Sequence, residues 1–357
     1  MIILGSTGSI GVNTLAIAKK FNLNIEVLVA GSNIALLNKQ IKEFNPSLVI
    51  IKDAKDIPKV DFKNVLSGQD AIIQMIQNSS SKVVVNALVG FFGLLPTITA
   101  IKCGKKVALA NKESLVVAGK FIDTTMINPI DSEHFGLWYL LDNKKIDSLT
   151  ITASGGSFRD TPLEKLKDVT IKEALNHPNW AMGNKITIDS ATMTNKLFEL
   201  VEARWLFDTT KCDAIIEPKS IIHAMVNFTD GSTTAHIANA NMQLPIAYAL
   251  LGKLDEQILP PVDLLKLQNL EFKKIETSRY PIWDIKDELL QNDNMGVVLN
   301  GANEIAVEAF LDGKVGFLDI AKISLDTINK FHNIKINSLD DIFEANKNIR
   351  EYSRTLI

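Results

Sequence analysis

Short apolar runs alternate with longer amphipathic runs over roughly the first 125 residues. The short runs predict β-strands at 2–4, 25–30, 48–51, 83–86 and 107–109. The longer runs predict helices at 10–20, 35–44, 70–76, 94–103 and 113–126. Strands that alternate with helices are typical of βαβ units, and strands this apolar are typical of a parallel sheet covered on both faces. The pattern therefore predicts a Rossmann-like parallel sheet.

A different pattern follows this region. Residues 146–153 alternate between apolar and polar and predict a half-exposed strand, and 191–207 predict one helix. Two further strand-like runs, 221–229 and 232–240, flank Asp230-Gly231, which predicts a hairpin with a two-residue turn. That turn would place Met225 opposite His236. These elements predict a second domain of α+β class.

The last part of the chain predicts a helical domain. Residues 253–290 contain three prolines in a mixed pattern and predict a connector, and amphipathic runs predict helices at 295–312, 317–332 and 338–352. The expected fold class is thus α/β, with an N-terminal Rossmann-like parallel sheet, a central α+β catalytic domain and a small C-terminal helical domain. The expected division is a dinucleotide domain over 1–125, a catalytic domain with a flap over 126–254, a connector over 255–290 and a helical domain over 291–357.

Composition narrows the class of function. The 357 residues are 46% hydrophobic and 22% charged, which is the balance of a globular protein rather than a disordered chain. The net charge of −3 shows no basic excess, so we expect no nucleic-acid partner. The apolar stretch 83–101 is broken by Gly90, Gly93 and Pro96, so we expect no membrane span. Cys103 and Cys212 fit no metal or disulfide spacing, which favours a cytoplasmic location.

The first motif is a glycine-rich turn directly after the first predicted strand. Gly5, Gly8 and Gly11 open the first predicted helix, where backbone N–H groups bind the pyrophosphate of a dinucleotide. The alternative is an ordinary tight turn between a strand and a helix. The second strand ends in Gly31 and Ser32, without the acidic residue that grips the ribose of NAD. The sequence therefore favours NADP over NAD.

Two carboxylates stand close together at Asp131 and Glu133. In an extended chain, residues i and i+2 share a face, so both could bind Mg²⁺ or Mn²⁺. The alternative is an aspartate that caps a helix, followed by an acidic residue in the first turn. A third carboxylate, Glu199, shares a predicted helix face with Asn195 and Lys196 and could complete the metal site. That face could instead be a solvated surface with a Lys–Glu pair.

Three further segments carry candidate chemistry. Ser154 and two glycines follow the predicted strand at 146–153, and such a loop can turn N–H groups toward an anion or merely connect two elements. The helix-breaking segment 177–183 contains Trp180 and could form a lid, or its histidine and tryptophan could be structural. His223 and His236 lie on opposite arms of the predicted hairpin, on one face. We favour a structural or interface role for this pair over a zinc site.

Together these motifs resemble the 1-deoxy-D-xylulose 5-phosphate reductoisomerase family. The matching segments are GSTGSIG (5–11), ALANKES (108–114), PIDSEH (129–134), TASGGSFR (152–159), HPNWAMGNK (177–185), IDSATMTNK (188–196) and NGANEIAV (300–307). They occur in order along nearly the whole chain.

The resemblance implies a role for each matching residue. Thr7, Gly8, Ser9 and Ile10 would hold the pyrophosphate of NADPH, Gly31, Ser32 and Asn33 would face its adenosine ribose, and Asn111, Glu113 and Gly183 would help to hold it. Asp131, Glu133 and Glu199 resemble the ligands of Mg²⁺ or Mn²⁺. Lys112, Ser132 and Glu133 would contact the oxygens of the substrate, and Ser154, His177, Ser190, Asn195 and Lys196 would surround its phosphate. Trp180 and Met182 would close over it.

The resemblance also implies the reaction. A metal-dependent rearrangement of 1-deoxy-D-xylulose 5-phosphate, followed by hydride transfer from NADPH, would give 2-C-methyl-D-erythritol 4-phosphate for non-mevalonate isoprenoid biosynthesis. Lys112, Asp131, Glu133 and Glu199 would be the catalytic residues, and the enzyme would be a homodimer. Two alternatives are an NAD(P) dehydrogenase for a small acid or semialdehyde, and a non-catalytic NADP sensor. Neither gives a reason for the three acidic residues or for the segment from Ser154 to Lys196.

Overall fold

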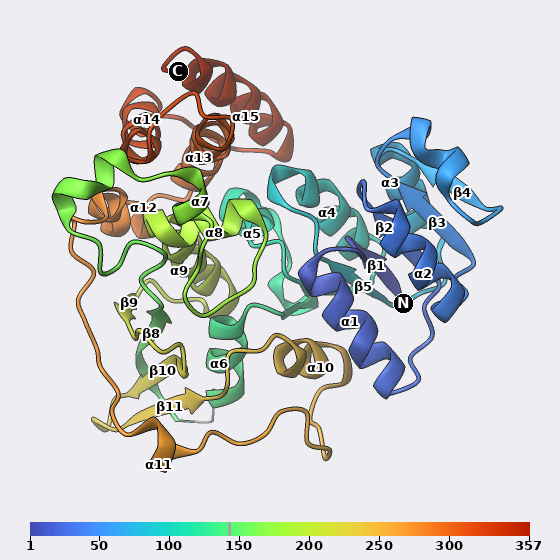
Figure 1. The fold of residues 1–357 in the computed structure, drawn as a ribbon, viewed down its shortest axis with the longest axis horizontal. Helices are drawn as coiled ribbons and strands as arrows, with labels where there is room; N and C mark the ends of the chain where they lie inside the picture. Colours follow the sequence, from blue (N-terminus) through green and yellow to red (C-terminus); the bar gives the residue numbers. More distant parts are fainter. Residues whose placement is uncertain (142–143) are drawn as a thin grey trace. The chain divides into compact units, whose positions relative to one another are not determined.

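The computed structural model describes residues 1–141 and 144–357. The chain forms two compact units, each built from separate stretches of sequence (Figure 1). The first unit comprises Met1–Ser114, Ile122–Ser132 and Asn241–Pro260, and the second comprises Leu115–Phe121, Glu133–Ala240 and Pro261–Ile357.

The first unit contains a seven-stranded sheet in the order β4-β3-β2-β1-β5-β6-β7, and all its neighbouring strands are parallel. The strands are β1 (Ile2–Leu4), β2 (Val27–Ala30), β3 (Leu48–Ile51), β4 (Val65–Ser67), β5 (Val83–Asn86), β6 (Lys106–Leu109) and β7 (Ile127–Pro129). The helical segments are α1 (Ser9–Lys20), α2 (Ile34–Phe44), η1 (Ala54–Lys59), α3 (Gln69–Asn78), η2 (Gly90–Gly93), α4 (Leu94–Lys102), η4 (Thr124–Met126) and α10 (Gln243–Leu251), with α5 (Glu113–Ala118) crossing into the second unit. The expected Rossmann-like sheet is confirmed.

Strand order explains where this sheet can bind a ligand. The chain adds β2, β3 and β4 on one side of β1 and then returns to place β5 on the other side. Ligands bind outside the carboxyl ends of parallel strands at such a reversal. The three residues of β1 are fully buried, as expected for a central strand covered on both faces. The loop after β1 therefore lies at the binding edge of the sheet.

The second unit contains a four-stranded mixed sheet in the order β11-β10-β8-β9. Its strands are β8 (Ile146–Ala153), β9 (Cys212–Ile216), β10 (Ile222–Phe228) and β11 (Thr233–Ile237). Its helical segments are η3 (Gly119–Phe121), α6 (Ser132–Leu140, whose first residue belongs to the first unit), η5 (Leu163–Asp168), α7 (Ile171–Ala174), α8 (Asn184–Thr192), α9 (Thr194–Phe207), α11 (Leu264–Leu267), η6 (Pro281–Ile285), α12 (Lys286–Gln291), α13 (Met295–Leu311), α14 (Phe317–Lys330) and α15 (Leu339–Arg354). The α+β class and the three C-terminal helices are confirmed.

Two expected helices are broken in the structure. The run 113–126 forms α5, η3 and η4 rather than one helix, and a Cβ atom at Gly119 would lie 2.2 Å from Trp205 Cδ1. The run 191–207 is also wrong as one helix, because Met193 adopts the left-handed conformation with φ of +73° between α8 and α9. Met193 is buried, so packing holds a backbone conformation that a methionine rarely adopts.

The hairpin register differs from the expectation by one residue. Ala224 lies opposite His236, and Met225 lies opposite Ala235. The Gly231 N–H donates to Phe228 O, and Gly231 has a φ of +86°, so the loop has three residues and ends in a left-handed glycine. The extra loop residue shifts every cross-strand pair relative to a two-residue turn.

Among residues 1–141 and 144–357, no helix combines the length and the apolar character needed to cross a bilayer.

Candidate functional site

The glycine-rich loop after β1 requires glycine at two positions for steric reasons. Gly5 has a φ of +89°, and a Cβ atom there would lie 2.7 Å from Ala87 O. A Cβ atom at Gly11 would lie 2.3 Å from Gly5 O, so the first turn of α1 packs directly on the loop. No side chain of the described residues caps α1 at Gly8, and its first turn has no acidic residue. The N–H groups at this helix start can therefore bind an anion.

The end of β2 offers small residues next to this loop. Gly31, Ser32 and Asn33 are exposed and follow Ala30 directly. The Asn33 side chain accepts a hydrogen bond from Leu36 N at 3.2 Å, so it caps α2. A Cβ atom at Gly31 would meet no atom within 4 Å, so this position leaves space for a ribose or its 2′-phosphate.

Asn111 and Glu113 stabilise the backbone near the carboxyl end of β5. The buried Asn111 amide donates to Leu88 O and Gly90 O, both at 2.9 Å, and Glu113 accepts from the Gly90 N–H at 3.2 Å. A Cβ atom at Gly93 would lie 2.4 Å from the Asn111 side chain. Both residues thus shape the loop that follows β5 at the binding edge of the sheet.

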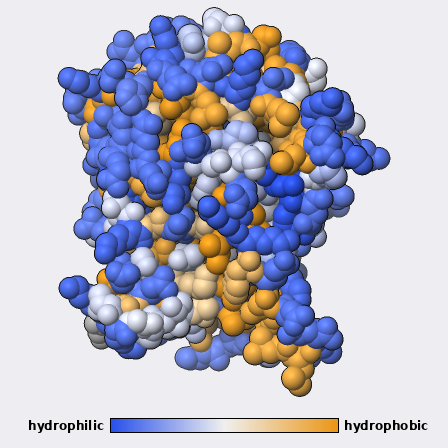
Figure 2. All heavy atoms as spheres, turned by 90° about the vertical axis from the view of Figure 1, so that its left-hand side faces the viewer, coloured by the Kyte–Doolittle hydropathy of each residue, from blue (hydrophilic) through white to orange (hydrophobic). Residues whose placement is uncertain are grey.

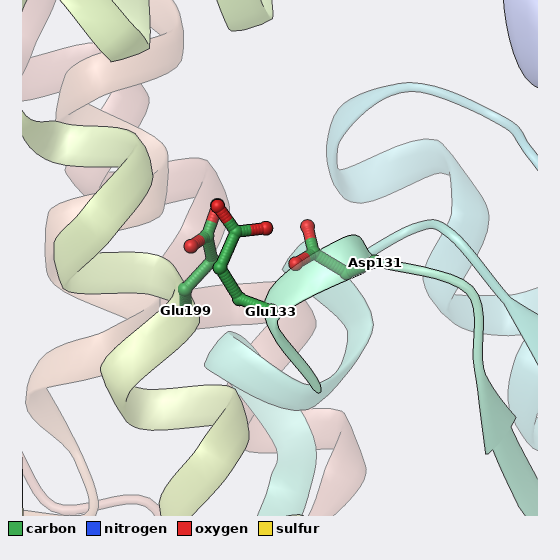
Figure 3. A group of neighbouring side chains, drawn as sticks. All are labelled: Asp131, Glu133 and Glu199. Atoms are coloured by element: carbon green, nitrogen blue, oxygen red, sulfur yellow. The ribbon is translucent and has the colours of Figure 1, made fainter. Parts of the chain in front are cut away.

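The carboxylates of Asp131, Glu133 and Glu199 lie close enough together to bind one metal ion. One oxygen from each of Asp131, Glu133 and Glu199 lies within 4.8 Å of the others, and Figure 3 shows the three carboxylates pointing toward one another. Glu133 lies in the first turn of α6, and Asp131 immediately precedes that helix. The expectation of extended geometry is therefore wrong, and the alternative of a helix start is confirmed. The helix start still brings both carboxylates to Glu199 on α9.

Two buried lysines contact these carboxylates. Lys112 Nζ lies 2.7 Å from Asp131 Oδ2, and Lys196 Nζ lies 2.9 Å from Glu133 Oε1 and 2.5 Å from Glu199 Oε2. Asn195 Nδ2 donates to the other Glu199 oxygen at 2.5 Å. Charges this close and this buried interact strongly. The arrangement holds three carboxylates together and places two ammonium groups beside them.

This donor set suits a hard divalent cation. Carboxylate oxygens are the ligands preferred by Mg²⁺ and Mn²⁺, and three of them leave coordination positions for oxygens of a substrate or water. The Glu199 side chain is 2% exposed, so it is shielded from bulk water. The three acidic residues therefore fit a metal ion of this class.

The hydrogen bonds around His177 fix the direction of a serine proton. His177 Nδ1 accepts from the N–H groups of Asn179 at 3.2 Å and Trp180 at 3.0 Å, so this nitrogen carries no proton. His177 Nε2 then donates to Ser154 Oγ at 2.9 Å, and the Gly156 N–H donates to the same oxygen at 3.1 Å. Because Ser154 Oγ accepts twice, its own proton is available for a further acceptor.

Electrostatics around His177 favour an anion. Burial, together with smaller contributions from the positive charges of Lys196 and Arg159, lowers the pKa of His177 to about 4. His177 is therefore neutral near pH 7, and the charges of Lys196 and Arg159 make the electrostatic potential around it positive. Neutral donors near positive charge are suitable for binding a phosphate group.

The break at Met193 separates the remaining candidates onto two helices. Ser190 lies on α8, whereas Asn195 and Lys196 lie in the first turn of α9. A Cβ atom at Gly156 would lie 2.6 Å from Ser190 O, so the loop containing Ser154 packs directly against α8. The loop that carries Ser154 thus lies against the turn of α8 that carries Ser190.

The segment 177–183 lies outside regular secondary structure. Asn179 Nδ2 donates to Pro218 O at 2.8 Å and to Ser220 Oγ at 2.7 Å, which fixes the base of the segment. Trp180 is half-buried, with its ring 6.2 Å from that of His223. Met182 is half-buried, and Gly183 is exposed at the start of α8.

The predicted proximity of the two hairpin histidines is confirmed despite the shifted register. The rings of His223 and His236 lie 5.8 Å apart, and His236 also contacts the rings of Phe135 and Tyr139. Among the described residues, neither histidine belongs to a metal-binding group, and the pair packs in an aromatic cluster. These contacts support the structural role.

We expect His236 to make the stability of the protein depend on pH. Burial lowers the pKa of His236 to about 4, with a smaller contribution from His223. The unfolded chain keeps a histidine pKa of about 6.5, so it binds more protons than the native state between these values. The melting temperature should fall as the pH decreases from about 6.5 toward 4, and H236N should show a shallower fall. Equal slopes for the variant and the wild type would contradict this assignment.

Several contacts near the carboxylates could not be inferred from sequence. His134, the last residue of PIDSEH, is buried, with Nε2 2.8 Å from Glu199 O and Nδ1 3.2 Å from Glu202 Oε2. It therefore ties α6 to α9. Arg159, the last residue of TASGGSFR, donates to Ser154 O at 2.8 Å and supports the glycine loop. The only feature of the sequence that pointed to His134 and Arg159 is their place in the segments that match the family.

Comparisons with known proteins agree along the whole chain. Profiles of three families match: 1-deoxy-D-xylulose 5-phosphate reductoisomerase at residues 1–119, its C-terminal domain at 127–207, and the DXP reductoisomerase C-terminal domain at 237–352. Proteins named 1-deoxy-D-xylulose 5-phosphate reductoisomerase are similar to this chain. The one from Nautilia profundicola is 58% identical, covering 99% of this chain and 98% of its own, and the one from Wolinella succinogenes is 49% identical, covering 100% of both.

Solved structures show the same similarity. A DOX-P reductoisomerase in complex with NADPH, fosmidomycin and magnesium has a TM-score of 0.93 at 34% identity, covering 99% of this chain and 97% of its own. The reductoisomerase from Zymomonas mobilis in complex with NADPH has a TM-score of 0.89 at 34% identity, covering 99% and 98%. The chain belongs to the 1-deoxy-D-xylulose 5-phosphate reductoisomerase family.

Proposed function

We propose that this protein converts 1-deoxy-D-xylulose 5-phosphate to 2-C-methyl-D-erythritol 4-phosphate, by skeletal rearrangement and then hydride transfer from NADPH, in non-mevalonate isoprenoid biosynthesis. The observation that carries the proposal is the cluster of Asp131, Glu133 and Glu199. Lys196 contacts two of these carboxylates, and its charge also acts on His177 among the anion-binding residues. A dehydrogenase for a small acid would need neither feature. The proposal therefore explains both the family membership and the geometry.

NADPH is the proposed reductant. Similar solved structures contain NADPH, and the loop after β1 offers the N–H groups of a helix start to its pyrophosphate. The proposed contact residues are Thr7, Gly8, Ser9, Ile10, Gly31, Ser32, Asn33, Asn111, Glu113 and Gly183. Ser32 would lie beside the 2′-phosphate, where it offers a hydroxyl but no positive charge.

Mg²⁺ or Mn²⁺ is the proposed metal, held by Asp131, Glu133 and Glu199. A similar solved structure contains magnesium. A bound divalent cation would act as a Lewis acid on the oxygens of the substrate. Lys112 and Lys196 lie against the same carboxylates, so they fix the orientation of these ligands. Lys112 and Ser132 would also contact the oxygens of the substrate backbone.

The phosphate of the substrate would bind through the donors around His177. The Ser154 hydroxyl proton is available to the phosphate because its oxygen already accepts two hydrogen bonds, and Ser190, Asn195 and Lys196 would add donors. Trp180 and Met182 would close over the bound substrate and exclude water. This contact is remote from the reacting carbons, so its binding energy can be used to position them.

Hydride transfer gives a direct test of this function. NADPH carrying deuterium at the transferred position should yield a methylerythritol phosphate product one mass unit heavier than that from unlabelled NADPH. Mass spectrometry of the product measures this shift. A product without deuterium, or reduction of the substrate without rearrangement of its carbon chain, would contradict the proposal.

Ser32 offers a test of cofactor selection. We expect S32R to raise the preference for NADPH over NADH by roughly tenfold, because an arginine would bind the 2′-phosphate with a charge-assisted hydrogen bond. Steady-state kinetics with both cofactors measure the ratio of the two kcat/KM values. The exposed position of Ser32 leaves room for the longer side chain. An unchanged ratio would show that the ribose binds elsewhere.

We also propose that the protein is a cytoplasmic homodimer with the expected domains at 1–125, 126–254, 255–290 and 291–357. Strand β11 is an edge of the four-stranded sheet, and edges that stay unpaired tend to associate. The second unit also exposes apolar side chains: Leu264 and Leu265 on α11, with Leu265 92% exposed, and Phe272 shortly after that helix. Figure 2 shows apolar side chains gathered at the lower end of one face, the end at which Figure 1 places α11 and β11. Such a surface favours a second copy as its partner.

The dimer should depend on the segment that contains α11. Light scattering after gel filtration should give twice the mass of one chain for the wild type, and L265D should shift the population toward monomer. The exposed K266D on the same helix provides a control for charge, since it buries no apolar surface. A monomeric wild type, or equal effects of both variants, would contradict the proposed interface.

A further inference from the structure

Asp189 is a buried carboxylate that the proposed reaction does not use. It lies on α8 and is 2% exposed. Lys185 Nζ lies 2.6 Å from Asp189 Oδ2, and Asn303 Nδ2 donates to Asp189 Oδ1 at 2.7 Å. Lys185 belongs to the same helix, whereas Asn303 belongs to α13 in the C-terminal helical region, which lies against α8 (Figure 1). One carboxylate therefore joins α8 to a distant part of the sequence.

The position of α8 controls the anion-binding residues. Ser190 follows Asp189 directly, and the loop containing Ser154 packs on the same part of the helix. A Cβ atom at Gly156 would lie 2.6 Å from Ser190 O and 2.6 Å from Ala191 Cα, so this contact has no free space. A small rotation of α8 would move Ser190 and the glycine loop together. The bond that fixes Asp189 thus fixes two of the phosphate donors.

Asn303 is more polar than packing alone requires. It is fully buried, and burying an amide costs free energy unless the amide is hydrogen-bonded. An apolar residue would fill the contact between α13 and α8 without this cost. Asn300, fully buried on the same helix, bonds instead to Glu304 one turn later, and Glu304 pairs with Arg350. Only Asn303 of this pair reaches the helix that carries Ser190.

We propose that Asn303 is a positioning residue for the phosphate site: by holding Asp189, it fixes Ser190 and the loop of Ser154 in the geometry that binds the phosphate group. The proposal rests on the proposed function insofar as the ligand is a sugar phosphate. It gives the segment NGANEIAV, which lies far from the carboxylate cluster in sequence, a role in substrate binding. The C-terminal helices then contribute to affinity without touching the substrate.

The test compares N303A with N300A. We expect N303A to raise KM for 1-deoxy-D-xylulose 5-phosphate about tenfold, because a hydrogen bond to a charged group is lost and Ser190 is no longer held. The inhibition constant of inorganic phosphate should rise by a similar factor. The kcat should stay within about threefold, and the affinities for NADPH and Mn²⁺ should not change. N300A loses a buried amide of the same helix, and it should leave KM and the phosphate constant unchanged.

Other results would overturn the proposal. A purely structural role predicts that N303A lowers kcat or the amount of folded protein while KM and the phosphate constant stay at wild-type values. If N303A does not fold, K185M provides a second test. Lys185 is the other donor to Asp189 and is only partly buried, so its replacement should raise KM and the inhibition constant of phosphate without unfolding the protein. Unchanged constants in K185M would then overturn the proposal.

Failure of the proposed function would be visible separately. If the wild type does not turn over the sugar phosphate, calorimetric titration with inorganic phosphate still compares wild type, N303A and N300A. Weaker phosphate binding in N303A alone would support the positioning role even then. Equal phosphate binding by all three proteins would overturn it.

Discussion

E199Q should abolish turnover while NADPH still binds. Glu199 supplies the third carboxylate of the cluster, and its two oxygens contact Lys196 and Asn195. An amide keeps the shape but removes the negative charge that a divalent cation needs. The loss of metal-assisted stabilisation amounts to about 4 kcal/mol, which is roughly a thousandfold decrease in kcat. Steady-state assays at saturating Mn²⁺ measure this loss, and fluorescence titration measures NADPH affinity.

The control for this variant is E304Q. Glu304 is also partly buried and paired with a cation, Arg350, but it lies in the helical region. It should retain activity within a few-fold of the wild type. Metal-dependent turnover that persists in E199Q at more than about a tenth of the wild-type rate would show that the ligand assignment is wrong.

G11A should weaken NADPH binding by about a hundredfold. A Cβ atom at Gly11 would lie 2.3 Å from Gly5 O and 2.5 Å from two Ser6 backbone atoms. Backbone has to move to remove this overlap, and it is the same backbone whose N–H groups would bind the pyrophosphate. Loss of two such charge-assisted bonds is worth about 3 kcal/mol, which corresponds to the expected factor.

V12A is the matched control for G11A. Val12 is the next residue of α1 and is 43% exposed, so its truncation leaves the loop unchanged. Its NADPH affinity should equal that of the wild type. Wild-type affinity in G11A would mean that this loop does not bind the cofactor. Loss of Mn²⁺ affinity in G11A would instead indicate general unfolding.

The parallel sheet was predictable because its strands are short, apolar and separated by amphipathic helices. The C-terminal helices were predictable for a similar reason, since Gly313 and Gly316 stand between two clear helical patterns. The conformation of Met193 was not, because a buried methionine with positive φ is held by tertiary packing rather than by local preference. The hairpin register also failed by one residue, since Asp230-Gly231 is compatible with loops of two and three residues.

At the candidate site, too, the sequence predicted some features and not others. The three acidic residues could be proposed from sequence, because each stands in a distinctive segment and a metal needs several carboxylates. Their geometry could not: Asp131 and Glu133 converge through the start of α6 rather than through an extended chain. The proton direction at Ser154 depends on His177, Asn179 and Trp180 together. Such a network becomes visible only in three dimensions.

The most direct test of the proposed function follows NADPH absorbance with purified protein and 1-deoxy-D-xylulose 5-phosphate, with and without Mn²⁺. We predict that NADPH is oxidised only when both the sugar phosphate and the metal ion are present. Oxidation that continues at the full rate after the metal has been removed by a chelator would contradict the metal-dependent mechanism. Absence of oxidation under every condition, from folded protein that binds NADPH, would contradict the proposed reaction itself.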